Sequence, residues 1–185
     1  MQPPVLAVVS GPPGAGKTTL ARRIAETVGC PAVIRDEIKQ GMVLADPGYQ
    51  TGGDDPLNVP ALHAFFDVLE TLAQAGATVV AEAAFQDRLW TPHLAPLTAH
   101  ADVRIIRCAV DAATAHQRII DRAGLDPHRA AHGDQDLLDA IAVGRRSLDD
   151  FIDIRLDVPR LTVDTSDGYH PGLDTIIAFL TRPIP

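Results

Sequence analysis

The segment SGPPGAGKT, residues 10–18, has the residue types and the spacing that bind phosphate groups. It matches the pattern G-x-x-x-x-G-K-S/T, whose fixed positions here are Gly11, Gly16, Lys17 and Thr18. Glycines let successive backbone N–H groups approach a phosphate closely, because no side chain stands in the way. The lysine can reach the β- and γ-phosphates, and the threonine hydroxyl can ligate Mg²⁺. The segment therefore predicts a nucleoside triphosphate site, with ATP and Mg²⁺ as the expected cofactors.

The whole phosphate-binding loop is expected to contact the nucleotide. A helix that begins near residue 16 adds the positive end of its dipole to the site. The alternative is a tight turn with a solvated lysine, but the motif is complete and lies between an apolar run and a helical pattern. The expected contacts are Gly11, Pro12, Pro13, Gly14, Ala15, Gly16, Lys17, Thr18 and Thr19.

A second group of candidate residues follows a short strand expected at 32–34. Asp36 lies where the carboxyl ends of parallel strands converge on the ligand crevice. Its carboxylate is suited to accept a proton from an attacking hydroxyl, or to hold that hydroxyl in line with the γ-phosphate. Lys39, one helical turn further on, is suited to bind an anionic group of the substrate. The alternative is that Asp36 only caps a helix within a solvated, charged face.

An acidic residue also ends a later apolar run, ATVVAE. Glu82 is suited to contact Mg²⁺ through a water molecule, as acids at strand ends do in triphosphate sites. The alternative is a buried acid that accepts hydrogen bonds from local N–H groups. Phe85 follows in an expected loop, where it could stack on a substrate or belong to the core.

Arginines in the last third of the chain are candidates to stabilise the transferred phosphoryl group. Arg118 and Arg122 are four residues apart and share one face of an expected helix, and Arg129 follows a bend that contains Gly and Pro. Planar guanidinium groups suit the charge that develops on phosphate oxygens. The alternative for Arg118 is an ion pair with Asp121 or Asp111.

Strand-like runs alternate with helical patterns, which favours an α/β fold with a parallel sheet. We expect strands at 5–9, 32–34, 77–81, 103–108 and 160–163. We expect helices at 16–28, 36–44, 60–75, 87–98, 112–123, 134–143 and 171–180. These elements fit a three-layer α/β/α sandwich with a five-stranded parallel sheet, in one domain over residues 1–185. In such a fold the loop after the last strand commonly borders the adenine, so Thr165 is an expected nucleotide contact.

Composition narrows the partners. The 185 residues carry a formal net charge of −8, which disfavours long nucleic acid but allows a small anion in a local positive pocket. No apolar run is long enough to span a membrane. The two cysteines and seven histidines lack metal-ligand spacing, so we expect no zinc site. A cytoplasmic location is the expectation.

The segments SGPPGAGKTTL and IRDEIKQGM together resemble the P-loop kinases grouped with polynucleotide 5′-hydroxyl kinases, zeta toxins and chloramphenicol phosphotransferase. The resemblance implies a P-loop fold with a helical lid at about 115–135 and an acceptor region at about 36–75. It implies that Asp36 is the general base and that Lys39 assists substrate binding. It also implies that Glu82 contacts substrate or positions a metal-bound water. The lid arginines would close over the phosphates, Arg122 first, then Arg118 and Arg129.

These observations predict an ATP-dependent kinase that phosphorylates a hydroxyl of a small polar molecule, such as a nucleoside, a sugar or an aminoglycoside-like compound. Two related acceptors stay open, namely the 5′-hydroxyl of a polynucleotide and a nucleotide-sugar. An alternative from another class is a regulatory ATPase whose output is conformational. It would hydrolyse ATP without regard to any acceptor.

Overall fold

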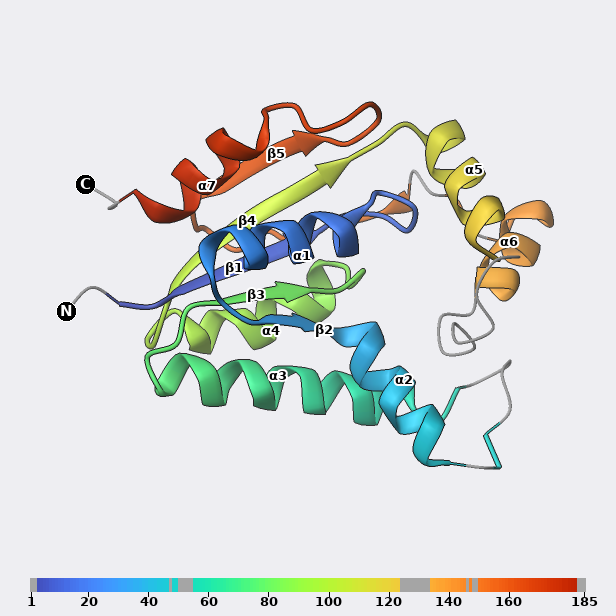
Figure 1. Ribbon diagram of the computed structural model, residues 1–185. Coiled ribbons are helices and arrows are strands. Elements are labelled where there is room, and N and C mark those ends of the chain that lie inside the picture. Colours follow the sequence, from blue (N-terminus) through green and yellow to red (C-terminus); the bar gives the residue numbers. More distant parts are fainter. Residues whose placement is uncertain are drawn as a thin grey trace.

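The computed structural model describes residues 3–46, 48–49, 55–123, 134–145, 147 and 150–182. A five-stranded parallel sheet lies at its centre, in the order β2-β3-β1-β4-β5 (Figure 1). The strands are β1 (Val5–Ser10), β2 (Ala32–Ile34), β3 (Val79–Glu82), β4 (Asp102–Ala109) and β5 (Arg160–Asp164). The expected five-stranded parallel sheet is thereby confirmed.

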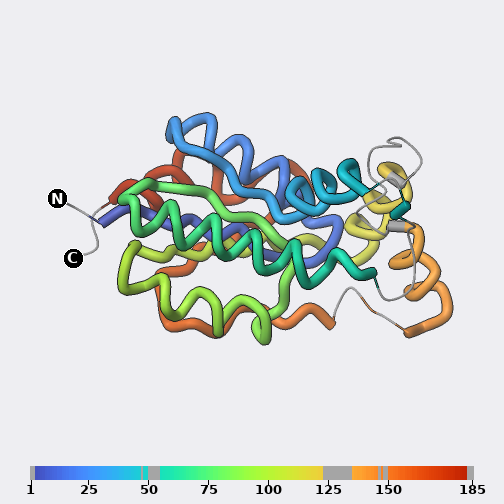
Figure 2. The backbone as a smooth tube through the Cα atoms, turned by 90° about the horizontal axis from the view of Figure 1, so that it is seen from below, coloured from blue at the N-terminus to red at the C-terminus, as the bar shows by residue number. Residues whose placement is uncertain are grey.

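Helices cover both faces of the sheet, and two further helices lie beyond the carboxyl ends of the strands. They are α1 (Lys17–Val28), α2 (Arg35–Ala45), α3 (Asn58–Gln74), α4 (Asp87–Leu97), α5 (Ala112–Ala123), α6 (Asp134–Ala142) and α7 (Leu173–Thr181). One face carries α1 and α7, and the other carries α3 and α4 (Figures 1 and 2). The helices α5 and α6 lie beyond the carboxyl ends of the strands, at the opposite end from the start of β1.

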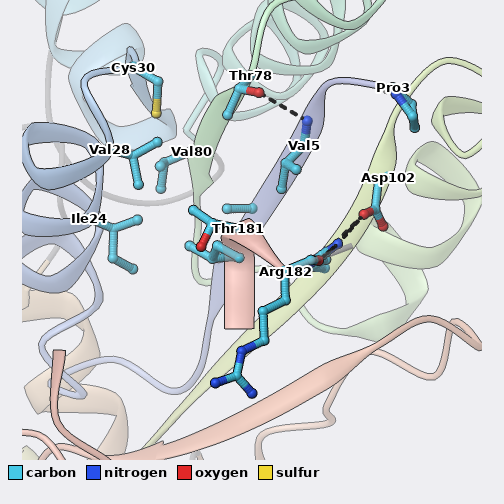
Figure 3. A pocket seen from close by; sticks show the side chains of 13 residues that line it. Pro3, Val5, Ile24, Val28, Cys30, Thr78, Val80, Asp102, Thr181 and Arg182 are labelled. Carbon is cyan, nitrogen blue, oxygen red and sulfur yellow. Dashed lines mark hydrogen bonds and ion pairs between the residues drawn. The ribbon is translucent and has the colours of Figure 1, made fainter. Parts of the chain in front are cut away.

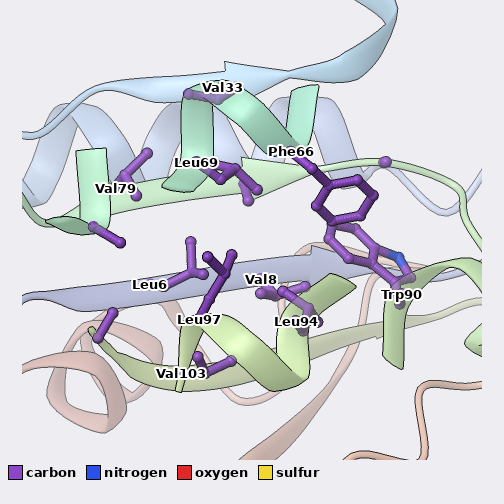
Figure 4. Close-up of a cluster of buried hydrophobic side chains, with 14 of the residues drawn as sticks. Leu6, Val8, Val33, Phe66, Leu69, Val79, Trp90, Leu94, Leu97 and Val103 are labelled. Atoms are coloured by element: carbon purple, nitrogen blue, oxygen red, sulfur yellow. The ribbon is translucent and has the colours of Figure 1, made fainter. Parts of the chain in front are cut away.

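The central strands are apolar because both of their faces are covered. In β1, the residues from Leu6 to Ser10 are all buried, as expected for a strand between two helical layers. Leucine, valine and aromatic side chains from the sheet, α3 and α4 fill one side of the core (Figure 4). Four apolar residues of α1 fill the other side at helical spacing: Leu20, Ala21, Ile24 and Ala25.

The start of β3 differs by two residues from the expected 77–81, and the end of α3 explains the difference. Gly76 adopts a left-handed conformation with φ 77°, and the N–H of Ala77 donates to the carbonyl of Leu72 at 2.9 Å. Ala77 is therefore still part of the helix C-cap and cannot join the sheet ladder. The strand begins at Val79 and runs on to include Glu82.

Among the described residues, no helix combines the length and apolar composition that a membrane span requires.

Candidate active site

The phosphate-binding loop joins β1 to α1 at the carboxyl edge of the sheet, and two of its glycines are required by their surroundings. A Cβ on Gly11 would lie 2.5 Å from the carbonyl oxygen of Cys108 in β4, and one on Gly14 would lie 2.5 Å from that of Ala115 in α5. Both glycines also have positive φ angles, of 149° and 80°. The loop is therefore packed tightly between β4 and α5, and only glycine fits at these two positions.

Lys17 is the first residue of α1 and is 7% exposed. Its Nζ donates a hydrogen bond to the carbonyl oxygen of Pro12 at 2.9 Å. The loop thus holds the ammonium group within its own curve, at the positive end of the helix dipole. A phosphate bound there would take the place of the Pro12 carbonyl as the partner of this group.

Thr18 and Glu82 meet although they are 64 residues apart. The Thr18 hydroxyl donates to the Glu82 carboxylate, with Oγ1 and Oε2 separated by 2.9 Å. Glu82 is 4% exposed at the end of β3, next to β1 in the sheet. A hydroxyl and a carboxylate are oxygen donors of the kind Mg²⁺ binds beside nucleotide phosphates, so these residues fit that ion. In the described ranges, no group of three or more His, Cys, Asp and Glu is arranged to hold a metal.

Asp36 lies in the first turn of α2, whose N-cap position is Ile34, so the alternative that Asp36 is only the helix cap does not describe its place. Its carboxylate is 39% exposed and lies 3.1 Å from Nη1 of Arg35. Nη2 of Arg35 donates to Oδ1 of Asn58 in α3 at 2.8 Å. The Arg35 guanidinium also lies 5.7 Å from the centre of the Phe85 ring. Arg35 therefore ties the Asp36 turn to α3 and to the loop after β3.

Lys39 is buried, and its ammonium forms an ion pair with Asp55. Asp55 also accepts hydrogen bonds from the Tyr49 hydroxyl at 2.8 Å and from the Leu57 amide at 2.9 Å. Burial opposes ionisation of Asp55, but the hydrogen bonds from Lys39, Tyr49 and Leu57 outweigh it and lower the pKa of Asp55. Burial, followed by the bond to Asp55, raises the pKa of Tyr49 to about 12. The expected anion-binding lysine is thus paired within the protein in this structure.

Arg118 reaches back from α5 to the phosphate-binding loop. Its Nη2 donates to the carbonyls of Thr165 at 2.7 Å and Ser166 at 3.0 Å, and its Nη1 donates to Gly14 at 3.4 Å. The ion pairs considered as an alternative do not form, because the Arg118 guanidinium is directed to these carbonyl oxygens, while Asp121 accepts from Gln117 and Asp111 from the Thr114 amide. Arg118 therefore holds α5, the phosphate-binding loop and the loop after β5 together.

Three other residues were expected to bind the nucleotide or to belong to the lid, and the structure describes two of them. Thr165 is 4% exposed, and its hydroxyl lies 3.0 Å from the carbonyl oxygens of both Ala15 and Ala109. Its hydroxyl thus links the phosphate-binding loop to the end of β4. Arg122 is half-buried, one turn beyond Arg118 on α5. Arg129 lies outside the described residues.

A cavity of about 310 Å³ opens beside the phosphate-binding loop. Pro13 lines it from that loop, Phe85 and Arg88 from the segment after β3, and Arg145 and Phe151 from the segment after α6. Among the described residues, no part of 36–75, the region expected to shape the acceptor site, lines this cavity. Arg88, Arg145 and Phe151 were not predicted. A basic residue six positions after Glu82 is a weak signal for Arg88, and the other two carry no local signal.

A second cavity, of about 390 Å³, lies at the other end of the sheet (Figure 3). Its walls are mainly apolar and include Val5 at the start of β1 and Val28 near the end of α1. The phosphate-binding loop follows the opposite end of β1. This cavity is therefore separate from the candidate active site.

The parallel sheet with a glycine-rich loop between its central strand and α1 defines the P-loop class of α/β proteins. A family model described as an AAA domain, AAA_33, matches residues 6–144. The chain belongs to this family, and the resemblance to P-loop kinases expected from its sequence is confirmed.

Solved structures of kinases share the fold. A proposed kinase from Chloroflexus aurantiacus is 25% identical, with a TM-score of 0.72 over 97% of this chain and 94% of that one. A gluconokinase from Sinorhizobium meliloti 1021 is 20% identical, with a TM-score of 0.57 over 98% and 94% of the two chains. The APS kinase of Mycobacterium tuberculosis, in complex with AMPPNP and APS, is 18% identical, with a TM-score of 0.54 over 88% and 90%.

Similar curated sequences come from mycobacteria. Uncharacterized proteins of Mycobacterium bovis and Mycobacterium tuberculosis are 31% identical in an alignment 129 residues long, which covers 64% of this chain and 26% of each relative. The chain thus spans about a quarter of the length of these relatives.

Proposed function

We propose that the protein is an ATP-dependent phosphotransferase that moves the γ-phosphate of ATP to a hydroxyl of a small polar molecule. The observation that carries this proposal is the 2.9 Å hydrogen bond between Thr18 and Glu82, formed beside a complete phosphate-binding loop. It brings a hydroxyl and a carboxylate together where a nucleotide-bound metal ion would lie. Asp36 follows β2 at the same edge of the sheet and stays open to solvent.

The chain's own residues supply binding, orientation and a proton acceptor. Lys17 would exchange the Pro12 carbonyl for oxygens of the β- and γ-phosphates, while Thr18 and Glu82 would hold Mg²⁺, Glu82 through water. When bound, Mg²⁺ neutralises charge on the β- and γ-phosphate oxygens. The acceptor oxygen forms a bond to the γ-phosphorus as the bond from that phosphorus to the β-bridging oxygen breaks. The acceptor proton passes to the Asp36 carboxylate, and ADP leaves with the bond's electron pair.

The segment from α5 to α6 acts as the lid in this proposal. Arg118 is already fixed against the phosphate-binding loop, so its role is to position that loop. Arg122, one turn further along α5, is the arginine proposed to stabilise the transferred phosphoryl group. Closure of the segment would exclude water, which favours transfer to an acceptor over hydrolysis.

Acceptor-dependent turnover tests the proposal. Purified protein is supplied with ATP and Mg²⁺ and a panel of sugars, sugar acids, nucleosides, aminoglycosides and 5′-hydroxyl oligonucleotides, and products are identified by their mass. We expect one class of small hydroxyl compounds to gain a phosphoryl group and to accelerate ADP formation. ADP formation at one constant rate, whichever acceptor is present, would instead assign the protein to the regulatory ATPases.

A further inference from the structure

We infer that the acceptor carries an anionic group, a carboxylate or a phosphate, which Arg88 and Arg145 bind in the 310 Å³ cavity beside Pro13. This inference rests on the proposed function and names the substrate class of that same site. The proposed function assigns residues mainly to the nucleotide. This inference assigns two further residues, both arginines, to the recognition of the acceptor.

The cavity lies next to the position proposed for the γ-phosphate. Pro13 forms one wall and belongs to the phosphate-binding loop itself. Another wall begins at Ala84, two residues after Glu82, whose carboxylate is bonded to Thr18. A molecule in the cavity would therefore lie beside the transferred group. Arg35 contacts the ring of Phe85, a lining residue, and pairs with Asp36, so the proposed base is linked to the same wall.

Two arginines from distant parts of the sequence meet at this cavity. Arg88 lies in the first turn of α4, and Arg145 follows α6. Within the described ranges, neither side chain forms a hydrogen bond or an ion pair. By contrast, Arg104 and Arg107 are paired with Asp102 and Asp153. Among the described residues that line the cavity, Asp150 is the acidic one beside the two arginines, so their charges sum to a net positive value in a chain of net charge −8. Such a local positive site selects an anion.

The rest of the lining limits the size and shape of the acceptor. Phe85 and Phe151 are aromatic, and Leu89 and Leu137 are aliphatic. Part of the wall therefore favours contact with an uncharged, carbon-rich part of the acceptor. Phe85 is held by a stacked contact with Phe66 at 5.9 Å between ring centres. A volume of about 310 Å³ is near the lower limit of the roughly 300–1,000 Å³ typical of ligand pockets. A compound of monosaccharide size with one acidic group fits these features.

The state of Lys39 strengthens this assignment. Its ammonium is buried against Asp55, so its charge is neutralised within the protein. Recognition of an acidic acceptor therefore falls to the arginines of the cavity, whose charges are not compensated in this way. Guanidinium groups also suit carboxylate and phosphate oxygens geometrically, because they offer parallel N–H donors.

Matched acceptors test the inference. Transfer of phosphate is measured with glucose, gluconate and glucose 6-phosphate, for the unmodified protein and for Arg88→Gln, Arg145→Gln and Arg23→Gln. Arg23 is the control, because it lies on the exposed face of α1 away from the cavity. We expect an anionic member to be preferred at least about tenfold in kcat/KM, and Arg88→Gln or Arg145→Gln to lower that value by about tenfold through KM. The KM for ATP should stay unchanged.

Arg88 and Arg145 could instead bind the phosphates of ATP. The same kinetic measurements distinguish binding of the acceptor from binding of ATP. A raised KM for ATP with an unchanged KM for the acceptor would assign the arginines to the nucleotide and overturn the inference. Equal transfer to glucose and gluconate, unaffected by either substitution, would also overturn it while leaving the kinase proposal intact.

Binding gives a readout that does not depend on transfer. Trp90 is the single tryptophan, and its ring lies 5.6 Å from that of Phe85 in the cavity wall. We expect gluconate or glucose 6-phosphate to change its fluorescence, and expect Arg88→Gln to weaken this response. If the anions change the fluorescence but no acceptor is phosphorylated, the anion site is supported and the kinase proposal is contradicted. No response to either anion, together with no transfer to them, would overturn the inference.

Discussion

At the scale of single residues, the pair formed by Thr18 and Glu82 is proposed to set the metal dependence of the reaction. Replacing Glu82 by Gln removes the charge but keeps an oxygen that the Thr18 hydroxyl can bond. We expect Glu82→Gln to fold normally and to lose about 10–100-fold in transfer rate, recoverable in part at high Mg²⁺. The measurement is kcat as a function of Mg²⁺ concentration. Glu26→Gln, on the exposed face of α1, is the control, and equal rates in the two variants would remove Glu82 from the metal site.

The buried pair of Lys39 and Asp55 is expected to control stability. Replacing Asp55 by Asn leaves the Lys39 ammonium buried without a counter-charge, and the loss should be about 3–5 kcal/mol of unfolding free energy. Urea denaturation measures it, with Asp67→Asn on the exposed side of α3 as the control. Equal denaturation midpoints would show that the pair does not stabilise the fold.

The pH dependence of stability follows from the same pair. The pKa of Asp55 in the folded protein is below its ordinary value of 3.8. As the pH falls, the Asp55 carboxylate is therefore protonated in the unfolded chain before it is protonated in the folded protein. The contribution of Asp55 is therefore complete above pH 3.8 and is lost as the pH falls toward the folded pKa. We expect the unmodified protein to lose unfolding free energy in this range and Asp55→Asn to lose less. Identical acid profiles for the two proteins would contradict the assigned pKa direction.

At the scale of elements, α5 is proposed to link the nucleotide site to the lid. Its backbone contacts Gly14 closely, and Arg118 extends the link to Thr165. We expect Arg118→Ala to raise the KM for ATP and to speed amide hydrogen exchange at Ala15 and Thr165, whose amides bond Pro12 and Ala109.

Arg122 provides the contrast for Arg118. If Arg122 stabilises the transferred phosphoryl group, Arg122→Ala should lower kcat with little change in the KM for ATP or in exchange at Ala15. The reverse pattern would exchange the two roles. Unchanged kinetics in both variants would place phosphoryl stabilisation outside α5.

At the scale of the whole molecule, the positions of the phosphate-binding loop and of its neighbouring carboxylates could be predicted from sequence, and the lining of the cavity beside them could not. The phosphate-binding loop is contiguous, and strand periodicity put Glu82 and Asp36 at one edge of a parallel sheet. The partner of Lys39 was not predictable, because it depends on the path of the loop that carries Asp55. Nor could it be predicted that Arg88 and Arg145 line one cavity, since no local pattern records which distant segments lie together.

Net charge also acts on the whole molecule, and it bears on the polynucleotide alternative. A chain of net charge −8 should repel a 5′-hydroxyl oligonucleotide more strongly as salt is removed. We therefore expect phosphoryl transfer to such an oligonucleotide to stay below that of the best small acceptor and not to improve at low salt. A steep gain at low salt would indicate a basic track and favour a polynucleotide kinase.

The measurement that tests the central proposal most directly compares Asp36→Asn with the unmodified protein, using the best acceptor of the panel and Asp67→Asn as the control. ATP affinity and the single-turnover rate of phosphoryl transfer are measured on the same preparations. We predict an ATP affinity within about twofold of the original and a transfer rate lower by about 10²–10⁴-fold, the usual contribution of a general base. Undiminished transfer in Asp36→Asn would contradict the proposed mechanism and remove this carboxylate from the chemistry.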